Sequence, residues 1–142
     1  MNEVSIFRLN LLRAMYLLIV VGLGFVLWPG VILKSQSWGL NQGVINCMLA
    51  AFSLVCAFGL RYPLQMLPIL LWELIWKSAW LGLVALPKFM AGTMDDATAE
   101  NTFAVLFVVL IPFVIPWGYV LKHYFGKPAD PWRVPARKAG AA

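Results

Sequence analysis

An acid and a base lie in the middle of an apolar stretch, among three tryptophans. In the segment LPILLWELIWKSAWLGLVALP, Glu73 and Lys77 are four residues apart, and Trp72, Trp76 and Trp80 surround them. An i, i+4 spacing with the acid first brings two charges onto one face of a helix. Such a pair could neutralise itself, bind an ion or a polar ligand, or exchange a proton.

A helical wheel gathers these groups on one side of the segment. At 100° per residue, both charges and all three tryptophans fall within a sector of about 140°. A charged side chain at the centre of a bilayer costs roughly 2.5–3.5 kcal/mol on insertion scales, so this sector should face the bundle interior or another protein. The candidate ligand or partner contacts are Glu73, Lys77, Trp72, Trp76, Trp80 and Gln65. Two interpretations stay open: a neutralised pair that fixes the rotation of the helix, and a functional site.

The composition indicates the class of protein that contains such a segment. Hydrophobic residues make up 62% of the 142 residues and charged residues 12%, which leaves too little polar surface to coat a soluble globule. Four apolar segments, 14–33, 44–60, 63–86 and 103–121, approach the ~20 residues that span a bilayer as a helix. The sequence therefore predicts an all-α integral membrane protein, a four-helix bundle formed by residues 1–125.

Both ends of the chain are assigned to the cytoplasm by charge. The basic run before the first apolar segment has no small-x-small cleavage site after it, which predicts an uncleaved first span. With the N-terminus inside, the cytoplasmic side holds Arg8, Arg13, Arg61, Lys122, Lys127, Arg133, Arg137 and Lys138, and the outer side holds Lys34 and Lys88. This asymmetry follows the positive-inside rule, so the net charge of +5 requires no nucleic-acid partner. Residues 126–142 are expected to form a basic, proline-rich cytoplasmic tail.

Two prolines interrupt the fourth apolar segment. Pro112 and Pro116 are one turn apart and remove two helical hydrogen bonds, so a structural kink is expected. The carbonyls of Val108 and Pro112 lose their usual donors, and in hydrocarbon they need replacements. We expect the Val108 carbonyl to face the bundle and to be reached by a water or a donor near Lys77 or Trp76.

The sequence offers few residues for metal binding, disulfide formation or catalysis. His123 is the only histidine, so no metal site and no haem ligand set is predicted, and no cofactor is assigned. Cys47 and Cys56 are nine residues apart and fall on opposite faces of a helix, which makes them packing residues rather than a disulfide. No catalytic triad, phosphate-binding loop or dinucleotide fingerprint occurs, and no catalytic residue is assigned.

Two segments, RYPLQMLPILLWELIWKSAWL and IPFVIPWGYVLKHYF, resemble parts of uncharacterised small four-helix inner-membrane proteins of bacteria. The resemblance implies a multi-pass protein of the bacterial inner membrane. The favoured function is a non-enzymatic accessory or interaction protein whose third span contacts a ligand, a larger membrane complex or further copies of itself. The alternatives are a small oligomeric proton- or cation-coupled transporter that uses Glu73, and an enzyme that acts on a lipid or quinone.

Overall fold

The computed structural model describes residues 4–133, and within them the chain is helical apart from short connections. Four helical stretches in this range are long and apolar enough to cross a membrane: Ile6–Ser37, Leu40–Arg61, Leu67–Met90 and Asp96–Val114. The expected all-α architecture with four candidate spans is therefore confirmed for the described residues.

Each stretch is built from named elements. The first contains α1 (Ile6–Val26), α2 (Trp28–Lys34) and the 3-10 helix η1 (Ser35–Ser37), and the second is α3 (Leu40–Arg61). The third joins α4 (Leu67–Trp80), the π-helical η2 (Leu81–Ala85) and α5 (Leu86–Met90). The fourth joins α6 (Asp96–Val105), the 3-10 helix η3 (Leu106–Leu110) and α7 (Ile111–Val114). The short α8 (Trp117–Val120) and the π-helical η4 (Leu121–Phe125) follow, and residues 134–142 of the expected tail lie outside the described part.

Local start signals place several helix ends away from the expected positions. The hydroxyl of Ser5 accepts the backbone N–H of Arg8 at 3.3 Å, so α1 begins well before residue 14. The carboxylate of Asp95 likewise accepts the N–H of Thr98 at 3.2 Å and starts α6 ahead of residue 103. Hydrogen bonds from Thr98 also hold the pKa of the Asp95 carboxyl below its usual range. Pro68 occupies the first turn of α4, where its missing N–H costs little, so this helix begins after residue 63.

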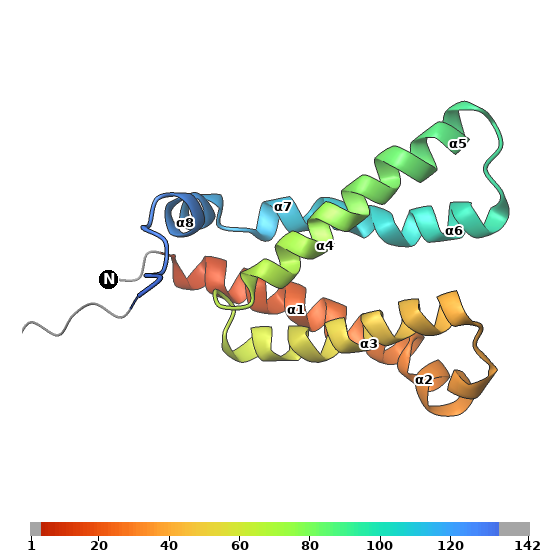
Figure 1. Ribbon diagram of the computed structural model, residues 1–142, viewed down its shortest axis with the longest axis horizontal. Coiled ribbons are helices and arrows are strands. Elements are labelled where there is room, and N and C mark those ends of the chain that lie inside the picture. Colours follow the sequence, from red (N-terminus) through yellow and green to blue (C-terminus); the bar gives the residue numbers. More distant parts are fainter. Residues whose placement is uncertain (1–3, 134–142) are drawn as a thin grey trace, which may run out of the picture.

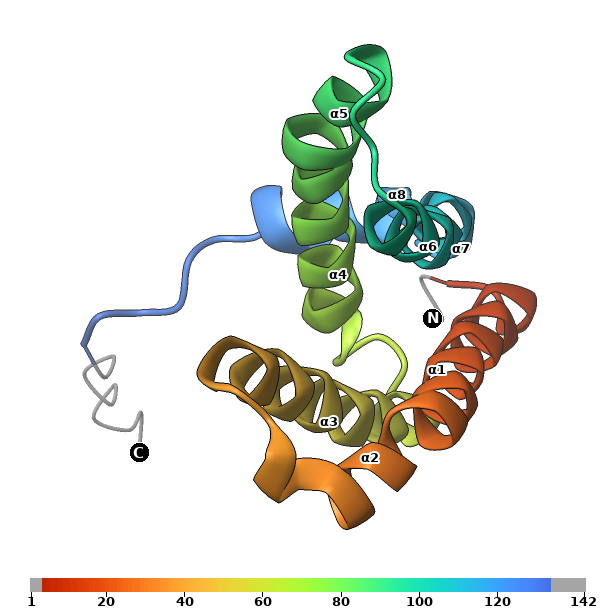
Figure 2. The same ribbon diagram turned by 90° about the vertical axis from the view of Figure 1, so that its right-hand side faces the viewer.

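The helices form two hairpins that meet at one end and separate at the other. Figures 1 and 2 show α1 beside α3 and the α4–α5 rod beside α6 and α7, with residues 62–66 joining the two hairpins. The start of α1, this connection and α8 lie at one end of the molecule, the closed end (Figure 1). The connections after α2 and α5 lie at the opposite, open end. The largest fully buried side chains all come from the closed end: Tyr16, Leu12, Leu67, Leu70, Ile115 and Cys56.

A very close approach holds the first hairpin together. The Tyr16 ring of α1 is fully buried against Gly59 of α3, where an added Cβ would lie 2.5 Å from the ring carbon Cγ. The Tyr16 hydroxyl then donates a hydrogen bond of 3.0 Å to the carbonyl of Pro63. Only a residue without a side chain lets the tyrosine lie this close to the α3 backbone and reach the connection beyond it.

Two arginines of α1 cap the ends of two other helices. Arg13 donates from Nε to the carbonyl of Leu60, one residue before α3 ends, at 3.1 Å. Arg8 donates from Nη1 to the carbonyl of Phe113 in α7 at 3.0 Å, and to that of Ile115 at 3.4 Å. The last carbonyls of a helix have no partner within it, and a cation there also compensates the helix dipole. The first half of α1 therefore connects both hairpins.

The kink expected in the fourth span takes the form of a break. Pro112 lies in the first turn of α7 without ending the helix. Ile115, the residue before Pro116, leaves the helix with φ −64° and ψ 127°. A residue that precedes proline is pushed toward this extended conformation. The chain resumes as α8, which turns away from the direction of α7 (Figure 1).

Local donors satisfy both carbonyls that the prolines leave free. The Val108 carbonyl accepts the N–H of Ile111, three residues on, because the 3-10 turn of η3 replaces the missing donor of Pro112. The Pro112 carbonyl accepts the indole N–H of Trp117 at 2.8 Å. A backbone donor in η3 thus satisfies Val108 locally, and Val108 lines the same cleft as Lys77, so a further donor to its carbonyl from that region stays a prediction.

Replacing Arg13 should weaken the closed end. In Arg13→Met the Leu60 carbonyl loses a charged donor, and we expect a loss of about 1–3 kcal/mol in the free energy of unfolding. Thermal and denaturant unfolding in detergent would measure it. Arg61→Met is the matched control. Arg61 carries the same charge as Arg13 and is the last residue of α3, the helix that Arg13 caps, but its side chain is exposed and lies over the Tyr62 ring. Equal stability of the two variants would contradict the capping role of Arg13.

Candidate functional site

The acid and base of the third span form a closed pair on α4. Glu73 is buried, with 3% of its side chain exposed, and its Oε1 lies 2.5 Å from the Lys77 ammonium nitrogen. Its Oε2 accepts a hydrogen bond of 2.6 Å from the indole N–H of Trp76. Both carboxylate oxygens therefore have a strong donor. The Lys77 nitrogen also lies 5.6 Å from the centre of a Trp76 ring, at cation–π distance.

Trp72 links this pair to the first hairpin. Its ring centre lies 6.1 Å from that of Trp76 and 5.8 Å from that of Phe52 on α3, with both ring pairs tilted. Aromatic pairs at these separations favour tilted arrangements and stabilise beyond the area they bury. The ladder Phe52–Trp72–Trp76 thereby connects α3 to the residue that donates to Glu73.

The other two candidates lie apart from the pair. Gln65 is exposed in the connection that precedes α4. Trp80 ends α4 and is partly buried, two turns beyond Glu73. Neither makes a hydrogen bond or ring contact with Glu73 or Lys77 within the described residues. The structure therefore brings together Glu73, Lys77, Trp76 and Trp72, and it leaves Gln65 and Trp80 outside that cluster.

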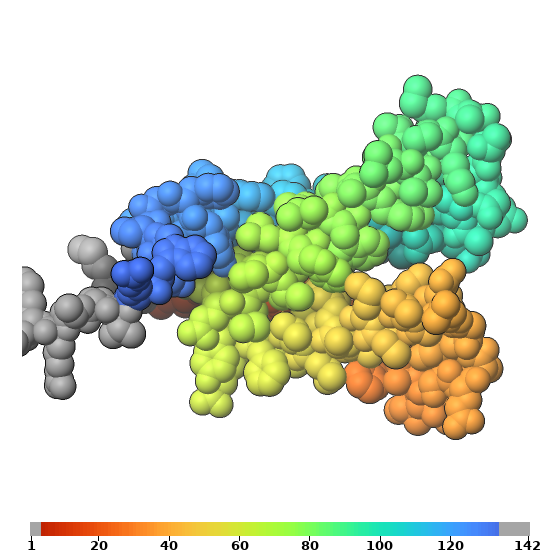
Figure 3. Space-filling view, in the orientation of Figure 1, coloured from red at the N-terminus to blue at the C-terminus, as the bar shows by residue number. Residues whose placement is uncertain are grey.

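The pair opens on a cleft between the two hairpins. This inter-hairpin cleft has a volume of about 460 Å³, and Glu73 and Lys77 are its charged lining residues. Its apolar walls come from α1, α3, α6, η3 and α7: Met15, Leu18, Ile19, Gly22, Leu23, Val26, Leu49, Phe52, Phe103, Ala104, Phe107, Val108 and Ile111. Figure 3 shows the surface hollowed between the α2–α3 lobe and the α5–α6 lobe.

Most of the cleft wall escaped prediction from the sequence. The residues of α1, α6 and η3 that face Glu73 are ordinary apolar residues of membrane spans, and nothing in their type distinguishes an inward from a lipid-facing position. The glycine at position 22 was one possible signal in the sequence. A Cβ built there meets nothing within 4 Å, so the absence of a side chain keeps the cleft wide. Gly24 has equally open surroundings yet does not line the cleft, so the glycine alone could not have located it.

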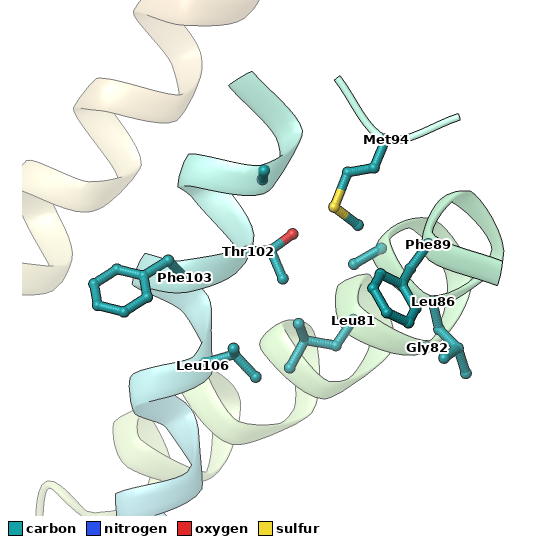
Figure 4. A pocket seen from close by; sticks show the side chains of 10 residues that line it. Leu81, Gly82, Leu86, Phe89, Met94, Thr102, Phe103 and Leu106 are labelled. Carbon is teal, nitrogen blue, oxygen red and sulfur yellow. The ribbon is translucent and has the colours of Figure 1, made fainter. Parts of the chain in front are cut away.

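A second, larger groove lies at the open end of the second hairpin, between η2–α5 and α6–η3. It has a volume of about 630 Å³, and Figure 4 shows its side chains, among them Leu81, Leu86, Phe89 and Phe103. Thr102 is the one polar side chain among its described lining residues, and its hydroxyl already donates to the Thr98 carbonyl at 2.6 Å. This groove offers a ligand no free polar group, so we assign the chemistry to the inter-hairpin cleft.

The cysteines and the histidine, to which the sequence assigned no function, do not line the inter-hairpin cleft. Cys47 is exposed and Cys56 buried on α3, and both are free thiols, in keeping with their opposite faces. His123 is stacked on Tyr119, with ring centres 5.0 Å apart, in η4 at the closed end. Among the described residues, no three histidine, cysteine, aspartate or glutamate side chains come together to hold a metal ion.

Single and double replacements of the pair should behave differently. Glu73→Gln leaves the partly buried Lys77 ammonium without its partner, and we expect a loss of about 3 kcal/mol in the free energy of unfolding. Glu73→Gln combined with Lys77→Met removes both charges and should recover much of that loss, because removal of a whole buried pair is often nearly neutral. Thermal unfolding in detergent across a range of pH would compare the variants. A double variant no more stable than the single one would contradict simple neutralisation and would indicate a third partner for the remaining group.

Comparisons with known proteins leave the cleft as the guide to function. No family model matches this chain, no curated protein sequence matches it, and no solved structure matches its fold. The resemblance to small inner-membrane proteins therefore stays an expectation, and the inter-hairpin cleft is the feature of this chain that points to a function.

Proposed function

We propose that this chain is a non-enzymatic accessory protein of the bacterial inner membrane that binds a membrane-embedded molecule in the inter-hairpin cleft. One observation carries the proposal: the pair formed by buried Glu73 and partly buried Lys77 lines a cleft of about 460 Å³ whose other walls are almost entirely apolar. Ligand pockets typically enclose 300–1,000 Å³ and combine apolar walls with a few well-placed polar groups.

The uneven packing of the bundle supports a binding role. The fully buried side chains gather at the closed end, where they and the α1 arginines hold the hairpins together. The open half leaves inward-facing residues uncovered, and Phe107 and Leu18, both cleft residues, are 56% and 54% exposed. A bundle that needed only to be stable would bring these side chains together, since packing is the main force between helices in a membrane. An occupant of the cleft would supply the missing contacts.

The state of Glu73 favours binding over proton- or cation-coupled transport. A transporter that used this carboxylate would have to expose it during its cycle. Here both of its oxygens have donors, and only 3% of the side chain is exposed. Transport would require Lys77 and Trp76 to release Glu73 first, whereas a ligand can enter the cleft with the pair intact.

The proposed orientation has both ends of the chain in the cytoplasm. Arg8, Arg13 and Arg61 belong to the closed end, while Lys34 ends α2 and Lys88 lies in α5 at the open end. The positive-inside rule then directs the closed end toward the cytoplasm. In this orientation the cleft opens toward the periplasmic half of the bilayer, where lipids and lipid-soluble molecules could enter between the hairpins.

Filling the cleft should block binding without loss of stability. In Gly22→Leu the new side chain projects into open space within the cleft, and in Gly24→Leu it projects into open space outside it. Both changes replace a glycine in α1, so both should raise helix propensity by about 0.5–1 kcal/mol. A photo-crosslinking residue at position 107, expressed in intact cells, should capture a lipid-sized adduct in the parent chain and in Gly24→Leu, and much less of it in Gly22→Leu. Equal adduct in all three proteins would contradict the proposal, because lipid that merely surrounds the bundle would label them alike.

Reporter fusions test the orientation. Fusions after Lys34 and after Thr93 should report the periplasm, and fusions after Arg61 and Lys138 should report the cytoplasm, because the loops near the closed end carry most of the basic residues. A cytoplasmic signal at either of the first two sites would contradict the proposed topology.

A further inference from the structure

The two charges of the cleft are not equally available to a ligand. Glu73 exposes 3% of its side chain and Lys77 exposes 19%, although both line the cleft. The carboxylate is enclosed by its two donors, one from Lys77 and one from Trp76. A molecule in the cleft therefore finds both carboxylate oxygens already bonded, and Lys77 is the more accessible of the two charged side chains.

Lys77 retains hydrogen-bonding capacity. An ammonium has three N–H donors. One points to the Glu73 oxygen at 2.5 Å, and the Trp76 ring lies at cation–π distance. Among the described residues, the Glu73 carboxylate is the acceptor recorded for this ammonium. A ligand in the cleft can therefore accept a hydrogen bond from Lys77 while the pair stays closed.

Charge selects among possible head groups. The pair is electrically neutral, so an anion in the cleft would lose its hydration without gaining a net positive charge in return. A cation would find no free carboxylate oxygen. A neutral carbonyl oxygen needs only the donor that Lys77 has left, and a hydrogen bond from a charged donor is among the stronger ones. The remainder of the ligand must be apolar, because residues such as Leu18, Phe52 and Phe107 form the walls.

We infer that the inter-hairpin cleft selects neutral, lipid-soluble molecules that carry a carbonyl acceptor, held by a hydrogen bond from the Lys77 ammonium. This inference rests on the proposed function, and it names the chemical class of the occupant. It assigns Glu73 a positioning role: the carboxylate directs the Lys77 ammonium, and Trp76 fixes the carboxylate in turn.

Four probes with chains of similar length separate the head groups. They are 2-tridecanone, tridecane, dodecyltrimethylammonium and dodecanoate, each added at the same mole fraction of detergent to the purified full chain. Binding is followed by the rise in unfolding temperature and by the decrease in photo-crosslinking at position 107 when a probe is present during illumination. We expect the ketone to bind roughly 10- to 100-fold more tightly than the alkane, the gain from one hydrogen bond to a charged donor. The two ionic probes should bind no better than the alkane.

Variants assign the effect to Lys77. The double replacement Glu73→Gln with Lys77→Met should bring the ketone down to the level of the alkane and leave alkane binding in place. Lys88→Met is the matched control, since it removes one lysine from α5 outside the cleft and should keep the preference for the ketone. If the double variant does not fold, the ranking of the four probes on the unaltered protein still decides.

Each remaining outcome overturns a separate claim. If the ammonium probe ranks first, the carboxylate meets the ligand and the inference is wrong, while the cleft remains a binding site. If dodecanoate ranks first, or if the ketone and the alkane bind alike, selection for a neutral carbonyl is refuted and binding in the cleft again stands. If no probe binds, or if Gly22→Leu binds every probe as the parent chain does, the proposed function itself fails.

Discussion

The architecture depends on how the free carbonyls at the ends of two helices are satisfied. An α-helix leaves its last carbonyls without partners, and in a bilayer each unsatisfied group costs several kcal/mol. Here α3 and α7 both end near the closed end, and α1 supplies the donors from Arg13 and Arg8. One helix therefore connects the two hairpins at the points where their backbones most need a partner.

The contacts that hold the two hairpins together lie at the closed end, so the hairpins can separate at the open end. The side chain of Tyr16 fills the space above Gly59, and the fully buried residues surround this region. Beyond it the hairpins diverge, and the surface between them is hollowed (Figure 3). The Glu73–Lys77 pair lies where the packed region gives way to the cleft. At this position the ion pair is shielded enough to stay intact, and Lys77 is still accessible to a molecule in the cleft.

The sequence predicted those features that depend on hydropathy and periodicity. The four candidate spans and the polar sector of the third were visible because apolar runs and a 100° step per residue leave a clear pattern. Helix ends were displaced because Ser5 and Asp95 act as polar caps beyond the apolar window. The interior side of α1 could not be identified, since Leu18 and Leu23 have the same composition as lipid-facing leucines. The arginine caps were equally hidden, because Arg8 and Arg13 satisfy a charge rule and give no sign of distant carbonyl partners.

The separation of the capping contacts along the chain orders events during biogenesis. Arg13 and its acceptor are 47 residues apart, so this contact becomes available once the first hairpin has left the ribosome. Arg8 and the Phe113 carbonyl are 105 residues apart, so the first helix waits for almost the entire chain before its second bond can form. The Arg8 contact is therefore among the last to join the hairpins, later than the Phe52–Trp72 ring contact, and a chain that ended before Phe113 would hold α1 with one of its two carbonyl contacts made.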